Sequence, residues 1–225
     1  AKENIYLFDS RGLVVKGRDH LTPNKEQFAH PIEGETNFIE VVHQLKPTVI
    51  IGVAGQPNVF TKAVIEAMAN LNDHPIIFAL SNPTTKSECT AEEAYRWSDG
   101  KAIFASGSPF DSVEFKGKTF YPGQGNNAYI FPGLGLGIVI SRASRVVDEM
   151  LVIAAQTLGE MVSQTDFNEG RLYPPLTNIR EISLKIATAV AEYVFDNNLA
   201  QVPRPENIEQ TIRARAYLPE YISYV

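Results

Sequence analysis

The sequence predicts an α/β protein in which a parallel sheet covered by helices is followed by a C-terminal set of helices. Two observations indicate this fold class. Short apolar runs alternate with helical patterns in the first half, as in parallel strands joined by crossover helices, and long amphipathic helical patterns occupy the second half. We place the boundary between the two portions after residue 133, which gives portions 1–133 and 134–225.

Four apolar runs in the first portion have the length of strands: 5-IYLF-8, 48-TVIIGV-53, 76-IIFAL-80 and 102-AIFAS-106. They are rich in Ile, Val and Phe, which favour strands. Because successive positions are apolar, we expect a sheet that is buried on both faces.

Helical patterns lie between these runs. Residues 36–46 and 61–71 carry apolar side chains at helical spacing, and Pro47 ends the first of these segments. Thr90 with Glu93 three residues later is typical of a capping box, which predicts a third helix.

The second half begins with a loop system. Residues 118–133 are dense in Pro, Gly and Asn, and two long helices are predicted over 146–162 and 179–195. The tail, 203–225, mixes Pro with aromatic residues, and we expect it to lie over the surface or against another subunit.

Composition excludes several classes of protein. The chain has 225 residues, of which 44% are hydrophobic and 20% charged, so a disordered or acidic-tail protein is excluded. The net charge of −6 argues against a nucleic acid or an anionic membrane as partner, because both require a basic face. The longest apolar stretches are interrupted by Pro and Gly, and we expect no membrane-spanning segment.

Cysteine and histidine usage limits metal chemistry. The single Cys89 excludes a disulfide framework and any multi-cysteine zinc or iron–sulfur site in this chain, and it fits a reducing compartment; we expect a cytoplasmic protein. The histidines show no metal-ligand spacing, so we predict no metal site among these residues.

Small or polar residues follow every predicted strand. In an open parallel sheet, ligands bind outside the carboxyl ends of the strands, so these positions are the candidate site. Turns also favour such residues, but their recurrence along one edge of one sheet favours a ligand. The exits are Asp9-Ser10, Ala54-Gly55, Ser81-Asn82-Pro83 and Ser106-Gly107-Ser108-Pro109.

Asp9 gives the most specific signal. An acid directly after a strand of a dinucleotide-binding fold accepts hydrogen bonds from the adenosine ribose. The glycine-rich phosphate loop that accompanies such an acid belongs about 20 residues upstream, so we interpret the chain as beginning inside a nucleotide-binding unit, with the first strand and the glycine-rich loop missing. The alternative fingerprint, 133-GLGLGI-138, lacks a third small residue and a preceding strand, and close helix packing explains these glycines better.

Three asparagines are candidate substrate ligands. Asn82 lies at a strand exit, and Asn126 and Asn127 follow a glycine-rich loop. An amide holds a carboxylate or a hydroxyl without adding charge to the site. Turn chemistry explains the same residues equally well, so the residues alone leave both interpretations open.

Several strings closely resemble the C-terminal part of malic enzymes, the NAD(P)-dependent oxidative decarboxylases of malate. They are 80-LSNPT-84, 104-FASGSPF-110, 121-YPGQGNN-127 with 131-FPG-133, and 171-RLYPP-175, and the likeness spans essentially the whole chain. The resemblance implies a Rossmann-like cofactor domain followed by C-terminal helices. It also implies a homodimer or homotetramer that converts malate to pyruvate and CO₂ with Mg²⁺ or Mn²⁺.

The resemblance also assigns residues. It implies that Asn82, Asn126 and Asn127 contact the substrate, with Asn82 and Asn126 also at the nicotinamide end of the cofactor. It implies that the dinucleotide is bound by Asp9, Ser10, Lys25, Val53, Ala54, Gly55 and Ser81. Ser10 and Lys25 match positions that contact the adenosine 2′-phosphate in NADP-using members, and Arg11, Lys16 and Arg18 add positive charge nearby, which favours NADP over NAD.

The family's acid–base tyrosine and lysine and its metal ligands have no counterparts in this sequence. We therefore expect no catalytic residue and no metal ligand in this chain, and we expect the 225 residues alone to be inactive. A stand-alone nucleotide-sensing or oligomerisation module that has lost catalysis is the alternative, although such a module has no reason to keep Asn82, Asn126 and Asn127. A relative such as an amino-acid dehydrogenase fits the strand exits but not the GQGNN loop.

Overall fold

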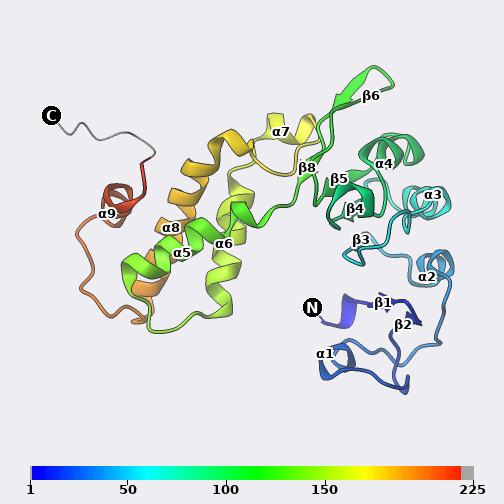
Figure 1. Ribbon diagram of the computed structural model, residues 1–225, viewed down its shortest axis with the longest axis horizontal. Helices are drawn as coiled ribbons and strands as arrows, with labels where there is room; N and C mark the ends of the chain where they lie inside the picture. Colours follow the sequence, from blue (N-terminus) through cyan, green and yellow to red (C-terminus); the bar gives the residue numbers. More distant parts are fainter. Residues whose placement is uncertain (1, 219–225) are drawn as a thin grey trace. The chain divides into compact units, whose positions relative to one another are not determined.

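The computed structural model describes residues 2–218 and divides the chain into two compact units, Ala1–Gln124 and Gly125–Val225 (Figure 1). Each unit has its own hydrophobic core. The sequence prediction placed the boundary later, after residue 133. The division comes earlier because the 3₁₀ helix η3 (Asn127–Tyr129) and the helix α5 (Phe131–Ser141) both pack against α8 (Ile179–Asp196).

A parallel sheet forms the centre of the first unit. Its strands are β3 (Val49–Gly52), β4 (Ile76–Ala79), β5 (Ile103–Ser106) and β8 (Gly123–Gln124), hydrogen-bonded in that order. All three pairings are parallel. The predicted α/β fold and the last three predicted strands are confirmed.

The prediction for the first apolar run, 5–8, is wrong. Phe8–Asp9 (β1) pairs antiparallel with Gly12–Leu13 (β2) in a sheet separate from the parallel one. The chain reverses tightly because Gly12 has φ +99°, and a Cβ there would lie 2.4 Å from the carbonyl oxygen of Glu35. A continuous apolar run indicates that a segment is extended but not which strand it pairs with, and here the turn selects the local partner.

Three helices lie along one side of the parallel sheet (Figure 1): α2 (Phe38–Leu45), α3 (Lys62–Leu71) and α4 (Ala91–Trp97). The helix α2 ends where Lys46 adopts a left-handed conformation before Pro47. The predicted capping box of α4 is confirmed, because the Glu93 side chain accepts the Thr90 N–H and the Thr90 hydroxyl accepts the Glu93 N–H.

Burial is one-sided at the edge of this sheet. In β3, Ile50 is buried, whereas Val49 and Ile51 are 39% and 57% exposed. Phe104 in the central strand β5 is fully buried. The expectation of a sheet buried on both faces is therefore wrong for β3 within the described residues, because Val49 and Ile51 lie on the face opposite Ile50 and are not buried by any described element.

The first unit is completed by short elements. They are η1 (Lys2–Asn4), α1 (Pro23–Glu26), η2 (Thr84–Lys86), and the hairpin of β6 (Val113–Phe115) with β7 (Lys118–Phe120).

The described part of the second unit is helical: α5, α6 (Asp148–Glu160), α7 (Gln164–Asn168), η4 (Leu176–Asn178), α8 and α9 (Ile208–Arg215). The helices predicted over 146–162 and 179–195 are confirmed as α6 and α8. The helix α9 packs on α8 and buries Ile208 and Ile212, and the rest of the predicted tail from residue 219 lies outside the described residues.

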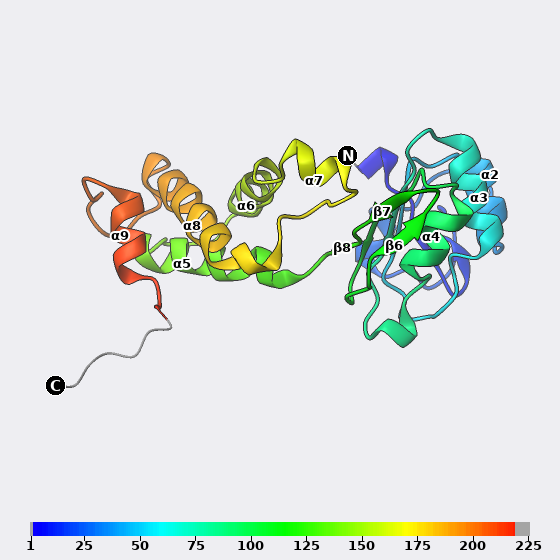
Figure 2. The same ribbon diagram turned by 90° about the horizontal axis from the view of Figure 1, so that it is seen from above.

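The glycines of α5 allow close helix packing, as predicted, at two of three positions. The helices α5 and α8 lie side by side in both views (Figure 1 and Figure 2). A Cβ at Gly133 would lie 2.7 Å from the carbonyl oxygen of Ser183, and one at Gly137 would lie 2.7 Å from that of Ala187. A Cβ at Gly135 would meet nothing within 4 Å, so this glycine is not required by packing.

Candidate functional site

Three of the four predicted strand exits lie together at the carboxyl edge of the sheet. Ala54-Gly55 follows β3, Ser81-Asn82 follows β4, and Gly107-Ser108 follows β5. Because these strands are parallel, their carboxyl ends meet at one edge. The fourth predicted exit, Asp9-Ser10, belongs to the separate β1–β2 hairpin.

Neighbouring exits are joined by hydrogen bonds. The Ser108 hydroxyl donates to the side-chain oxygen of Asn82 at 2.6 Å, which links the exits of β4 and β5. The side-chain Nε2 of Gln124, in β8, donates to the Gly107 carbonyl at 3.2 Å. Asn82 itself is exposed, so its Oδ1 is positioned while its amide group is accessible to a ligand.

The exits of β3 and β4 are joined through Ser81 and a buried acid that the sequence analysis missed. The N–H of Gly55 donates to the Ser81 hydroxyl at 2.8 Å, and that hydroxyl donates to Glu88 at 2.5 Å. Glu88 lies directly before Cys89 and two residues before the cap of α4. The available signal was a carboxylate within 87-SEC-89, whose burial only the tertiary structure reveals.

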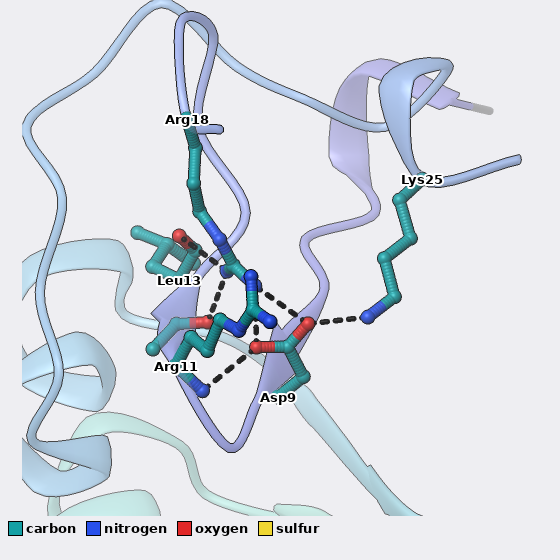
Figure 3. A network of polar contacts seen from close by, with 6 residues as sticks. Asp9, Arg11, Leu13, Arg18 and Lys25 are labelled. Carbon is teal, nitrogen blue, oxygen red and sulfur yellow. Dashed lines mark hydrogen bonds and ion pairs between the residues drawn. The ribbon is translucent and has the colours of Figure 1, made fainter. Parts of the chain in front are cut away.

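Asp9 forms the centre of a charged cluster (Figure 3). Both oxygens of its carboxylate accept hydrogen bonds from Nη2 of Arg18, at 2.6 and 2.7 Å. Lys25 donates to Oδ2, and the backbone N–H of Arg11 donates to Oδ1 at 2.9 Å. Arg18 also binds the carbonyls of Gly12 and Leu13 across the hairpin.

These contacts determine the charge state of Asp9. Burial acts to raise the pKa of this carboxyl, but hydrogen bonds from Lys25, Arg11 and Arg18 outweigh it and hold the pKa well below its usual range. The carboxylate is therefore ionised at neutral pH. It faces two cationic side chains, Arg18 and Lys25, so the cluster has one positive charge in excess.

The hairpin that carries this cluster packs toward the sheet. The ring centroids of Phe8 and of Phe38, on α2, are 5.1 Å apart. The ring centroids of Phe38 and of Phe60, which lies between β3 and α3, are 6.0 Å apart. The structure thus brings Asp9 and Lys25 together in one cluster, and Ser10, the residue after Asp9, is exposed at the hairpin turn.

Asn126 and Asn127 belong to the second unit, and both are exposed. The side chain of Asn126 accepts the Ala128 N–H at 2.8 Å and caps η3. This contact is the turn chemistry that the sequence left open, so the substrate role of these two residues stays a prediction.

The β3 exit leaves room for a bound molecule. Gly55 has φ +64°, and a Cβ at this position would meet nothing within 4 Å. Val53 beside it is 75% exposed. Open space beside a left-handed glycine fits a ligand that approaches the backbone closely, as a dinucleotide does.

Residues 2–218 contain no group of three or more His, Cys, Asp or Glu side chains arranged to hold a metal ion, so no metal-dependent step is assigned to them. No helix in the same part of the chain has both the length and the apolar character of a membrane span.

The fold and the site together define a class of protein. An open parallel sheet with small hydrogen-bonding residues along its carboxyl edge, beside an acid paired with cationic side chains, is the arrangement of a dinucleotide-binding domain. Comparison with known proteins narrows this class. Residues 1–195 match the family described as "Malic enzyme, NAD binding domain". The chain belongs to the malic enzyme family.

Similar proteins agree with this assignment. The chain is 53% identical to an NADP-dependent malic enzyme of Vitis vinifera over 99% of its own length and 38% of the relative's. It is 50% identical to an NADP-dependent malic enzyme of Dictyostelium discoideum, over 98% of this chain and 41% of that one. The chain thus spans about two fifths of the length of these relatives.

Solved structures support the fold. A malic enzyme from Entamoeba histolytica matches with a TM-score of 0.69 and 23% identity, over 93% of this chain and 40% of that one. A malic enzyme from Pyrococcus horikoshii matches with a TM-score of 0.56 and 28% identity, over 74% of this chain and 35% of that one. The Rossmann-like fold class predicted from the sequence is confirmed.

Proposed function

We propose that this chain is the cofactor-binding C-terminal part of a malic enzyme that oxidises malate to pyruvate and CO₂ and reduces NADP. Membership of the family and the names of the relatives support the reaction class. The observation that supports NADP is the cluster around Asp9, in which Arg18 and Lys25 leave a positive charge in excess.

The preference for NADP follows from charge. An adenosine 2′-phosphate placed beside Asp9 alone would meet a like charge. Arg18 holds the Asp9 carboxylate through two bonds, so Lys25 is available to move toward the phosphate without leaving Asp9 unpaired. Ser10, exposed at the same turn, supplies a hydroxyl donor to the phosphate.

The edge of the sheet binds the remainder of the cofactor and the substrate. We assign Val53, Ala54, Gly55 and Ser81 to the dinucleotide. Asn82 contacts both the nicotinamide end and malate. Asn126 and Asn127 are not part of this edge, and we assign them to the substrate and the nicotinamide ribose on the family resemblance. When bound, the cofactor's nicotinamide supplies the acceptor for the hydride that leaves C2 of malate. The neutral amide of Asn82, held by Ser108, orients the substrate without adding a charge that would oppose loss of CO₂.

A steady-state assay tests this function. The natural polypeptide that contains these residues is incubated with malate, Mn²⁺ and either NADP⁺ or NAD⁺, and formation of the reduced nicotinamide is followed by absorbance. We expect turnover with kcat/KM higher for NADP⁺ than for NAD⁺. Turnover that favours NAD⁺ would contradict the role of the Asp9 cluster, and absence of malate-dependent turnover would contradict the proposed reaction.

The remaining proposals concern the rest of the protein. We propose that the 225 residues expressed alone are inactive, because the family's proton-transferring residues and its Mg²⁺ or Mn²⁺ ligands have no counterparts among them. Malate-dependent reduction of NADP⁺ by this pure chain would refute the proposal. We also propose a cytoplasmic homo-oligomer, a dimer or tetramer. Sedimentation and cell fractionation test these proposals, and fractionation is informative because a rice relative is named as chloroplastic.

A further inference from the structure

Glu88 is an unusual acid in this molecule. Its side chain is fully buried, and it is the only charged residue among the buried residues of the described chain. None of the ion pairs found among residues 2–218 involves it. A buried carboxylate without a cationic partner is costly, so its hydrogen bonds must offset that cost.

Every side-chain hydrogen bond of Glu88 goes to a strand exit. Its Oε1 accepts the Ala54 N–H at 3.3 Å and the Ser81 hydroxyl at 2.5 Å, and its Oε2 accepts the Ser81 N–H at 3.3 Å. Ser81 extends this set, because its hydroxyl accepts the N–H of Gly55. One carboxylate thus fixes the backbone after both β3 and β4.

The last residue of β3 has no side chain, which leaves room for the side chain of Glu88. A Cβ at Gly52, the last residue of β3, would lie 2.4 Å from Cγ and Cδ of Glu88. The backbone of Glu88 is also held, since its carbonyl accepts the Phe60 N–H at 3.1 Å. These contacts place the Glu88 side chain against the end of β3, within hydrogen-bonding distance of the two exit turns.

These bonds orient the β3 turn. The N–H groups of Ala54 and Gly55 both point inward, toward Glu88 and Ser81. A Cβ on Gly55 would meet nothing within 4 Å, so the turn keeps open space for a ligand beside these bonded N–H groups. Asn82 follows directly after Ser81, so the same anchor sets the start of the segment that carries the substrate amide.

We propose that Glu88 is a positioning residue of the cofactor site: its buried carboxylate holds the exit turns of β3 and β4 in the geometry that receives the dinucleotide. This inference rests on the proposed function. Glu88 touches neither cofactor nor substrate and acts through Ala54, Ser81 and Gly55.

The test compares two glutamine variants of the natural polypeptide. Glu88→Gln keeps the size of the side chain but replaces one acceptor oxygen with an NH₂ group that faces an N–H donor. We expect the Kd for NADP⁺, titrated without malate, and the KM for NADP⁺ each to rise about tenfold, with a lower kcat, since bonds to a charged acceptor are lost. Glu92→Gln removes one negative charge from the exposed face of the adjacent helix and should change none of these values.

A second substitution separates positioning from folding. Ser81→Ala leaves Glu88 with its two backbone donors and disconnects Gly55, so we expect a smaller rise in the KM for NADP⁺ in a protein with wild-type circular dichroism. In the double variant the two losses should be less than additive, because both act on one set of bonds. If Glu88→Gln does not fold, Glu88→Asp decides the question, because it keeps the acceptor charge but shortens the side chain away from Ala54 and Ser81 and should raise the Kd for NADP⁺ as well.

The outcomes distinguish the two proposals. Wild-type protein that binds neither dinucleotide overturns the proposed function and this inference with it. Wild-type protein that binds NADP⁺, with folded Glu88→Gln and Ser81→Ala variants that bind it equally well, overturns the inference alone. A lower melting temperature with unchanged Kd, KM and kcat also overturns it, because the role would then be purely structural.

Discussion

The glycines of α5 give a quantitative prediction, because Gly133 and Gly135 lie in the same helix with different surroundings. Alanine is favoured over glycine inside a helix by about 0.8–1.0 kcal/mol. At Gly135 a new Cβ meets nothing within 4 Å, so Gly135→Ala should raise the free energy of unfolding by about 1 kcal/mol.

At Gly133 the same change is opposed by overpacking. The new Cβ would lie 2.7 Å from the Ser183 carbonyl oxygen and 2.8 Å from Cβ of Ile186, where ordinary contacts are 3.4–4 Å. Both atoms belong to the packed helix α8, so the two helices must separate. Overpacking of this kind costs roughly 1–3 kcal/mol. The middle of this range, about 2 kcal/mol, exceeds the gain of about 1 kcal/mol in helix propensity. We expect Gly133→Ala to lower the free energy of unfolding by about 1 kcal/mol.

Urea unfolding followed by circular dichroism measures this difference. With a slope of roughly 1–3 kcal/mol per molar urea, a difference of about 2 kcal/mol between the two variants separates their midpoints by about 1 M. If Gly133→Ala stabilises the protein as much as Gly135→Ala does, then α5 and α8 do not pack as closely as the structure shows, and the reasoning fails.

Three further predictions concern the first unit. Lys25→Gln should reduce the preference for NADP⁺ over NAD⁺ about tenfold, because a charge-assisted bond to the 2′-phosphate is lost; kcat/KM ratios measure this, and an unchanged ratio contradicts it. The pKa of Asp9 is lowered in the folded state from its usual 3.8, so the ionised carboxylate stabilises the fold at neutral pH, and this stabilisation is lost as the pH falls below about 4. Free energies of unfolding measured at pH 7, 5 and 3 should therefore decrease less for Asp9→Asn than for the wild-type protein. Burial raises the pKa of the Cys89 thiol, so a thiol reagent at mildly alkaline pH should modify it in urea but not in the native protein.

The local elements were predictable because their signals are local. The capping box at Thr90 and Glu93 needs only residues three apart, and the strands β4 and β5 need only a continuous apolar run. Pairing is not local, which is why the run 5–8 was assigned to the wrong sheet. Close helix packing was expected of the α5 glycines, but the bounds of α5 were not predicted, since its Pro and Gly residues disfavour a helix that packing against α8 then stabilises.

The site was partly predictable for the same reason. Position after a strand marked Ala54, Ser81 and Asn82, and their place at one edge followed from parallel pairing. The position of Glu88 in the sequence gives no such signal, because its proposed function depends on the turns that follow β3 and β4 and on the absence of a side chain at Gly52. Sequence reasoning also assigned Asp9 to the ribose without identifying Arg18 as its partner, because the approach of Arg18 Nη2 to both carboxylate oxygens is set by the hairpin.

The contacts described here predict which site residues are energetically coupled. Along the edge of the sheet, each exit is held by a side chain from its neighbour, as Ser108 holds Asn82. The residues that bond to the Asp9 carboxylate, Arg11, Arg18 and Lys25, all lie outside that edge. Double-mutant cycles on the free energy of NADP⁺ binding should therefore show an interaction of about 0.5–3 kcal/mol for Asn82→Ala with Ser108→Ala, and additivity within about 0.5 kcal/mol for Lys25→Gln with Ser108→Ala.

The comparison is informative because both cycles share Ser108→Ala. Any general loosening of the protein by that change would appear in both cycles equally. Coupling only in the first indicates that the edge acts as one preorganised unit, in which each amide and hydroxyl is oriented before the cofactor arrives. Equal coupling in both cycles would contradict this, and would mean that the adenosine and nicotinamide ends respond together to binding.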